Sequence, residues 1–139
     1  HVLVYGVTPA LQAEFDFGSI SLPLAKVIAA CNAHGAIAVP CHPGRPRVGM
    51  FAHTDALGVP AGVEIVEIYN GGSRDQEDQI AIEHASQLGY RGIGGSDSHI
   101  VSHVGRCATR FDAEIKSIDD LVLALKTGQF EAVNLKTGD

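Results

Sequence analysis

The sequence lacks any apolar run approaching the roughly 18 residues that a membrane-spanning helix requires. It also lacks an excess of basic residues, because 10 lysines and arginines stand against 16 aspartates and glutamates and the formal net charge is -6. Nucleic-acid-binding modules usually present a basic stripe, whereas the basic residues here are scattered. These two absences argue against a membrane protein and against a protein that binds DNA or RNA.

Paired cysteines are also lacking. Cys31, Cys41 and Cys107 form no CxxC motif, leave one cysteine over, and lie in apolar or strand-like segments. The sequence shows no basic segment followed by the short apolar segment of a secretory signal. We therefore expect a soluble protein of the reducing cytoplasm.

The length and the apolar content of the chain are sufficient for one domain. The chain has 139 residues, of which 45% are apolar and 19% charged, which suffices for one hydrophobic core but not for two ordinary domains. It opens on His1, directly inside the strand-like stretch "HVLVYG". We therefore expect the chain to be part of a longer protein.

Strand-like and helix-like segments alternate along the chain. We predict strands over 1–6, 36–39, 63–70, 90–95 and 130–134, and helices over 21–34, 75–88 and 117–127. Residues 7–20 and 101–105 are predicted as connections, and 43–62 as a long loop of the kind that is usually functional or disordered. Buried strands that alternate with helices favour parallel βα units, so we predict an α/β fold.

Polar side chains follow three of the predicted strands. His42 comes after one, Asn70 ends the next, and Asp97 and His99 come after the third. The carboxyl ends of parallel strands converge on one pocket, so these residues are expected to meet. Imidazole and carboxylate groups are ligands of borderline divalent metals, although an Asp-Ser-His turn with a surface histidine has the same spacing.

Several other polar residues have two interpretations each. Arg45 is either a phosphate clamp, through its planar fork of donors, or a solvated loop charge. His103 is either a ligand or a surface residue, and His53 is either exposed or a substrate contact. His34 is predicted near a helix C-terminus, and His84 as a half-buried packing residue.

Three segments, in this order, resemble one known family. "AIAVPCHPGRP", "VEIVEIYNGG" and "YRGIGGSDSHIVSHVGR" are similar to the second half of the polymerase and histidinol phosphatase (PHP) family, and "HVLVYG" resembles a family segment that contributes a histidine. The resemblance covers nearly the whole chain. Three linked motifs are much more specific than any one of them.

The resemblance implies a distorted (β/α)7 barrel of parallel strands alternating with helices. It implies two or three divalent metal ions, with manganese first and zinc or iron as alternatives, and hydrolysis of a small phosphorylated metabolite or nucleotide. By motif, the metal ligands are His1, His42, Asp97 and His99. Asp97 and His99 are also the implied catalytic residues, while Arg45 binds substrate and Asn70 lines the pocket.

The family's amino-terminal half, with its paired-histidine motif, has no counterpart here. We therefore expect residues 1–139 to be the carboxy-terminal portion of a single PHP domain, whose barrel is completed by a missing amino-terminal segment or by self-association. Two alternatives to a phosphoesterase remain. One is a non-catalytic PHP module with a structural or interaction role, and the other is an amidohydrolase-like enzyme that cleaves C–N bonds.

Overall fold

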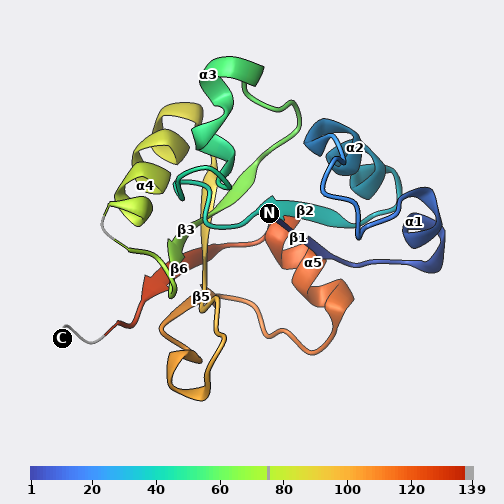
Figure 1. The fold of residues 1–139 in the computed structure, drawn as a ribbon. Coiled ribbons are helices and arrows are strands. Elements are labelled where there is room, and N and C mark those ends of the chain that lie inside the picture. The colour runs from blue at the N-terminus through green and yellow to red at the C-terminus, as the bar shows by residue number, and fades with distance from the viewer. Residues whose placement is uncertain (75, 137–139) are drawn as a thin grey trace.

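The computed structural model describes residues 1–74 and 76–136 (Figure 1). In chain order the elements are β1 (Val2–Tyr5), α1 (Pro9–Glu14), α2 (Leu24–Ala33), β2 (Ile37–Pro40), the 3-10 turn η1 (Met50–Ala52), α3 (Thr54–Leu57), β3 (Ile65–Asn70), α4 (Glu77–Leu88), β4 (Arg91–Gly95), the 3-10 turn η2 (Val101–His103), β5 (Cys107–Phe111), α5 (Ile118–Thr127) and β6 (Phe130–Asn134). The prediction of a mixed α/β chain is confirmed.

The strands pair two by two. β1 and β2 are antiparallel, with Val2 opposite Pro40 and Tyr5 opposite Ile37. β3 and β4 are parallel, and β5 and β6 are antiparallel. Contacts between β2 and β3, and from β4 to β5 and β6, bring the three pairs side by side. Within the described residues the strands do not close into a barrel.

The prediction of parallel strands throughout is therefore wrong for two of the three pairs. A helix between two strands normally carries the chain back along the sheet, which makes the strands parallel. The helix α5 does not do this, because it packs against β1 and β2 rather than over the β5–β6 pair that it connects. Hydrophobic periodicity identifies a helix but does not say which strands the helix will cover.

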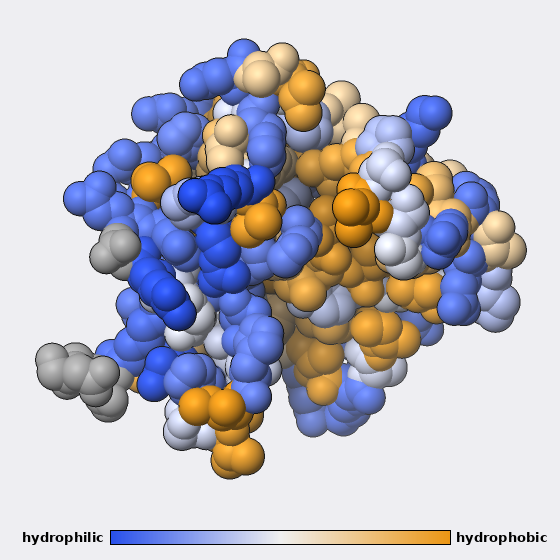
Figure 2. Space-filling view, in the orientation of Figure 1, coloured by the Kyte–Doolittle hydropathy of each residue, from blue (hydrophilic) through white to orange (hydrophobic). Residues whose placement is uncertain are grey.

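The core consists of two clusters on opposite faces of β2 and β3. One contains Ala38 and Val66 together with α1, α2 and α4, and the other contains Val39 and Ile65 together with α5. Every residue of β2 is buried, as expected for a strand covered on both faces. Figure 2 shows apolar side chains gathered between α2 and α5, while polar side chains cover the side of α4.

The helix boundaries follow local capping chemistry. Ser117 caps α5, because its hydroxyl accepts the backbone N–H of Asp120. Gly89 ends α4 in the left-handed conformation, with φ of 71°. The helix α2 begins after Pro23, later than the predicted start at residue 21, and has no side-chain cap.

Several elements were not predicted, among them α1, α3 and β5. The helix α1 lies in the predicted connection 7–20, where Thr8 caps the helix and Pro9 occupies its first turn. The strand β5 follows the loop after β4 and pairs with β6. Among the described residues, no helix has both the length and the apolar character needed to cross a membrane.

Candidate active site

Residues that follow three different strands meet at one end of the sheets. Arg45, in the loop after β2, donates from Nη2 to Asn70 Oδ1 at 3.2 Å and to Asp97 Oδ2 at 3.0 Å. Asn70 ends β3, and Asp97 lies two residues beyond β4. The structure thus brings together polar groups that are 25 and 52 residues from Arg45 in the sequence.

Unusual backbone conformations set the directions of the His42 and Asp97 side chains. His42 has φ of +34° and Asp97 has φ of +47°, in the left-handed region that side chains other than glycine rarely adopt. The loop around His42 is fixed by its backbone N–H, which donates to Glu67 Oε2 at 2.8 Å. Such conformations persist only where surrounding contacts hold them, and they cluster at functional sites.

Glu67 provides those contacts from the middle of β3. It is only 3% exposed, and the same Oε2 atom also accepts the Asn70 side-chain amide at 2.7 Å. The carboxylate fills the space next to Gly95, where a Cβ atom would collide with it. Burial raises the pKa of Glu67, although the hydrogen bonds from Asn70 and His42 act in the opposite direction. Sequence reasoning missed Glu67, yet a carboxylate in the middle of the predicted strand 63–70 was an available signal.

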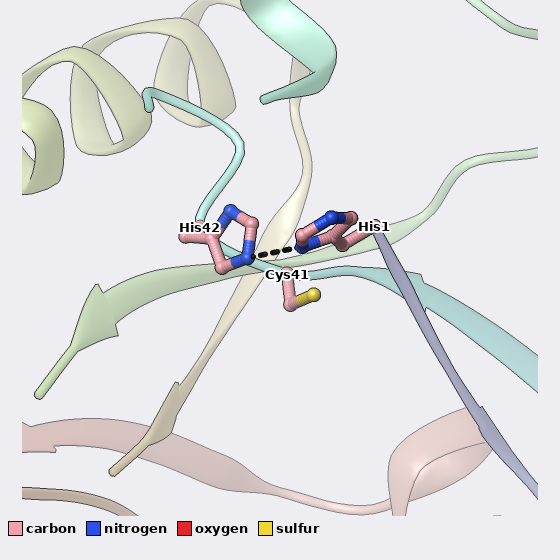
Figure 3. Close-up of side chains that lie close together, drawn as sticks. All are labelled: His1, Cys41 and His42. Carbon is pink, nitrogen blue, oxygen red and sulfur yellow. Dashed lines mark hydrogen bonds between the residues drawn. The ribbon is translucent and has the colours of Figure 1, made fainter. Parts of the chain in front are cut away.

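His1, Cys41 and His42 form a compact group of metal-ligating side chains (Figure 3). The Nδ1 atom of His1 lies 3.0 Å from Nε2 of His42, and the two rings meet edge to face. One ligand atom from each of the three residues lies within 4.8 Å of the others. Cys41 belongs to no predicted site, because a cysteine without a nearby second cysteine shows no metal-ligand motif in the sequence.

The protonation of this group suits a metal ion. Burial lowers the pKa of His42, helped by the positive charge of Arg45, so the imidazole stays neutral and keeps a lone pair for a ligand. Within the described part of the chain, the Nδ1 atom of His42 is buried without a hydrogen-bond partner. Burial and the charge of Glu67 raise the pKa of Cys41 to about 11, so a cation is needed to stabilise its thiolate. The residues present therefore fit a divalent metal.

Arg45 lies in a pocket beside this group. The pocket has a volume of about 450 Å³ and is lined by Arg45, Gly72, Arg74, Glu77, Asp97, His99 and His103. Besides its bonds to Asn70 and Asp97, Arg45 donates from Nε to Glu77 Oε2 at 3.1 Å. Glu77, at the start of α4, was not predicted. Two carboxylates and an amide thus hold the guanidinium in one orientation at the pocket wall.

His99 projects from the same pocket toward solvent. Its side chain is 83% exposed, and its Nδ1 lies 2.8 Å from the backbone carbonyl of Asp97. Because a carbonyl only accepts, Nδ1 carries the proton and Nε2 keeps its lone pair. This is the tautomer usual for a metal-ligating histidine, which donates its other ring N–H to a carbonyl or carboxylate.

The structure does not gather all four predicted metal ligands around one point. His1 and His42 belong to the group with Cys41, whereas Asp97 and His99 lie in the pocket with Arg45. Arg45, which is predicted to bind substrate, lines that pocket. Asn70 does not line it but accepts a hydrogen bond from Arg45.

The remaining histidines differ in position. His103 lines the pocket, half-buried on η2. His53 is exposed and bonds through Nε2 to the Arg47 carbonyl at 2.6 Å. His84 is half-buried, as predicted, and stacks on Phe51. His34 ends α2, as predicted, and pairs with an exposed glutamate.

Part of the chain matches a known protein family. No curated protein matches the chain significantly. Residues 76–130 match a family model described as PHP-associated, a segment that includes Asp97 and His99 but not His1, His42 or Arg45. This match confirms the resemblance to PHP proteins and is consistent with a carboxy-terminal part of a PHP domain.

Proposed function

We propose that the protein is a metal-dependent phosphoesterase that acts on a small phosphorylated metabolite or nucleotide. One observation supports this function above all others. The Arg45 guanidinium is held at the wall of a pocket that also contains Asp97 and His99, beside the group formed by His1 and His42. An oriented arginine next to metal-type ligands suits phosphoester hydrolysis, because both can stabilise charge on the phosphoryl oxygens.

Two pairs of residues are proposed to hold divalent metals. His1 and His42 form one pair, and Asp97 and His99 form the other. When bound, such metals supply an activated water molecule and polarise the phosphoryl oxygens. The separation of the two pairs supports at least two ions.

Arg45 is proposed to bind the phosphoryl group. Its bonds within the described residues use Nε and Nη2, so the N–H groups of Nη1 can reach a substrate oxygen. The contacts to Glu77 and Asp97 orient the fork before substrate arrives, so little conformational entropy is lost on binding. Arg45 offsets negative charge that develops on the phosphoryl oxygens.

His103 is proposed to act as the general acid that protonates the leaving group. It lines the pocket that holds Arg45, and it is the imidazole there that the metal assignment leaves free. A protonated His103 can donate to the leaving oxygen, which avoids expulsion of an unprotonated alkoxide.

A screen of phosphomonoesters tests this function. The protein is assayed with manganese, zinc or iron against sugar phosphates, nucleotides and p-nitrophenyl phosphate, and turnover that a chelator abolishes is the expected result. Metal binding without turnover of any phosphoester would favour the non-catalytic PHP module. Turnover of a cyclic amide but of no phosphoester would favour the C–N hydrolase.

A further inference from the structure

We propose that Cys41 is a metal ligand, which together with His1 and His42 forms a three-residue site that prefers zinc or cobalt to manganese. The inference rests on the proposed metal-dependent function and adds to it a ligand and a class of metal. Neither the sequence motifs nor the resemblance to PHP proteins gives Cys41 a role.

The β1–β2 pair places His1 and Cys41 on one face of the sheet. Val2 lies opposite Pro40, and the backbone N–H of Cys41 donates to the His1 carbonyl at 3.2 Å, so His1 and Cys41 form the next pair of the antiparallel ladder. Side chains of directly opposite residues lie on the same face, with Cβ atoms about 5 Å apart. The backbone ladder, rather than a chance orientation of side chains, therefore brings the thiol to the imidazole.

The left-handed backbone at His42 adds the third side chain. Neighbouring residues of a regular strand point to opposite faces, so His42 would normally point away from Cys41. Its φ of +34° breaks this alternation, and the bond from its N–H to Glu67 holds the turned conformation. As a result, His42 Nε2 lies 3.0 Å from His1 Nδ1 (Figure 3).

The spacing of the three ligand atoms suits a tetrahedral site. They lie within 4.8 Å of one another. Zinc bonds of about 2.0–2.1 Å to nitrogen and about 2.3 Å to sulfur place neighbouring ligand atoms roughly 3.5 Å apart, a change that small side-chain rotations supply. His42 is buried, Cys41 is half-buried and His1 is exposed. The exposed position of His1 leaves the group open to solvent on that side.

The ligand set determines which metal is preferred. Thiolate and imidazole favour zinc and its spectroscopic substitute cobalt, whereas manganese favours carboxylate and water. The group contains no carboxylate among the residues that the structure describes. On binding, the Cys41 thiol releases its proton to solvent, and the thiolate charge offsets one of the two positive charges of the metal.

Cobalt absorbance tests the proposal directly. The purified protein is stripped with a chelator and titrated with Co²⁺, and a thiolate-to-cobalt charge-transfer band in the near ultraviolet is expected. Cys41→Ser should lose this band and bind Co²⁺ about 10-fold more weakly or worse. Cys31→Ser and Cys107→Ser, which alter buried cysteines outside the group, should keep both the band and the affinity.

Three results would overturn the proposal: no cobalt binding, cobalt binding without the band, or a band that persists in Cys41→Ser. The wild-type spectrum decides the matter even if Cys41→Ser fails to fold. Hydrolysis of p-nitrophenyl phosphate is measured in parallel. Turnover without the band would leave the phosphoesterase standing while the Cys41 assignment fails, and the band without turnover would do the reverse.

Discussion

The two halves of the candidate site differ in how their side chains are held. In the group of His1, Cys41 and His42, the ligand atoms of two imidazoles and a thiol lie within 4.8 Å of one another. The carboxylate of Glu67 accepts a hydrogen bond from the backbone N–H of His42 rather than from one of these ligand atoms. In the pocket around Arg45, two carboxylates bind a guanidinium. The first arrangement offers lone pairs to a cation, whereas in the second one guanidinium faces two carboxylates, so its positive charge is offset within the pocket before any ligand binds.

Glu67 and Asn70 join these halves. Glu67 accepts the His42 N–H and the Asn70 amide, and Asn70 Oδ1 in turn accepts Arg45 and the backbone N–H of Gly72 at 2.8 Å. The two halves are therefore linked by a continuous chain of hydrogen bonds, of which the two on Glu67 are buried. The group of His1, Cys41 and His42 and the pocket around Arg45 are built on one shared support.

The largest effect is expected from His42→Ala, which removes the buried ligand of the metal group. Loss of outer-shell partners already costs about 10–100-fold in metal affinity, so loss of this ligand should cost about 100-fold or more and abolish phosphoesterase activity. Metal content by elemental analysis and turnover measure the two losses. His34→Ala, at the end of α2, is the control. Full metal content without activity would mean that His42 is not a ligand.

Glu67→Ala should come next, because it leaves the buried His42 N–H and the Asn70 amide without their acceptor. We expect a loss of about 3 kcal/mol in the free energy of unfolding, measured by urea denaturation. Both halves of the site should weaken together in metal binding and in substrate binding. A variant that loses only one of these properties would show that Glu67 does not join the halves.

Glu67→Gln tests the buried charge of Glu67 through the pH dependence of the free energy of unfolding. Because the folded-state pKa of Glu67 is raised above its ordinary value of 4.5, the folded protein holds the proton more tightly than the unfolded chain. The free energy of unfolding of the chelator-treated protein should therefore fall as pH rises from about 4.5 through the raised pKa. In Glu67→Gln this fall should be reduced. Identical pH profiles of the two proteins would contradict the buried position of the charge.

Arg45→Ala should act on the phosphate pocket alone. Removal of one positioned donor of this kind typically costs about 100-fold in turnover, so we expect kcat/KM for a phosphomonoester to fall about 100-fold. Cobalt binding at the His1, Cys41 and His42 group should change little. Arg110→Ala on β5, which breaks an exposed ion pair with Glu131 on β6, is the matched control. An equal loss in both arginine variants would reject a specific role for Arg45.

The smallest effect is expected from Ser117→Ala, away from both halves. Loss of the Ser117 cap on α5 should lower the free energy of unfolding by about 1 kcal/mol in urea denaturation. Metal affinity and kcat/KM should stay at their wild-type values. A change in either would show that α5 is coupled to the site more closely than its contacts indicate.

Much of the framework could be predicted from the sequence, because local chemistry determines it. The apolar segment before His42, the glycine after α4 and the Ser117 cap all act over a few residues. The meeting of Asn70 and Asp97 at one end of the sheets was also expected. The PHP resemblance rested on these same strand ends, and the family match supports it.

What could not be predicted depends on contacts distant in sequence. Strand direction in the β1–β2 pair follows from how α1 and α2 return the chain, which periodicity does not reveal. The role of Glu67 could be recognised only from its contact with the His42 N–H, which lies 25 residues away in sequence but 2.8 Å away in space. Cys41 was overlooked because a cysteine without a partner in the sequence gives no sign of neighbouring imidazoles.

The position of α5 has a consequence for how the protein is made. This helix covers one face of β1 and β2, and Lys126 Nζ donates to the carbonyl of Gly35, 91 residues earlier. Contacts this distant in sequence form slowly, since a long loop must close first. On the ribosome, the strand that leads into His42 therefore stays half-covered until α5 has emerged, and a nascent chain released before α5 exposes an apolar face on which chaperones can act.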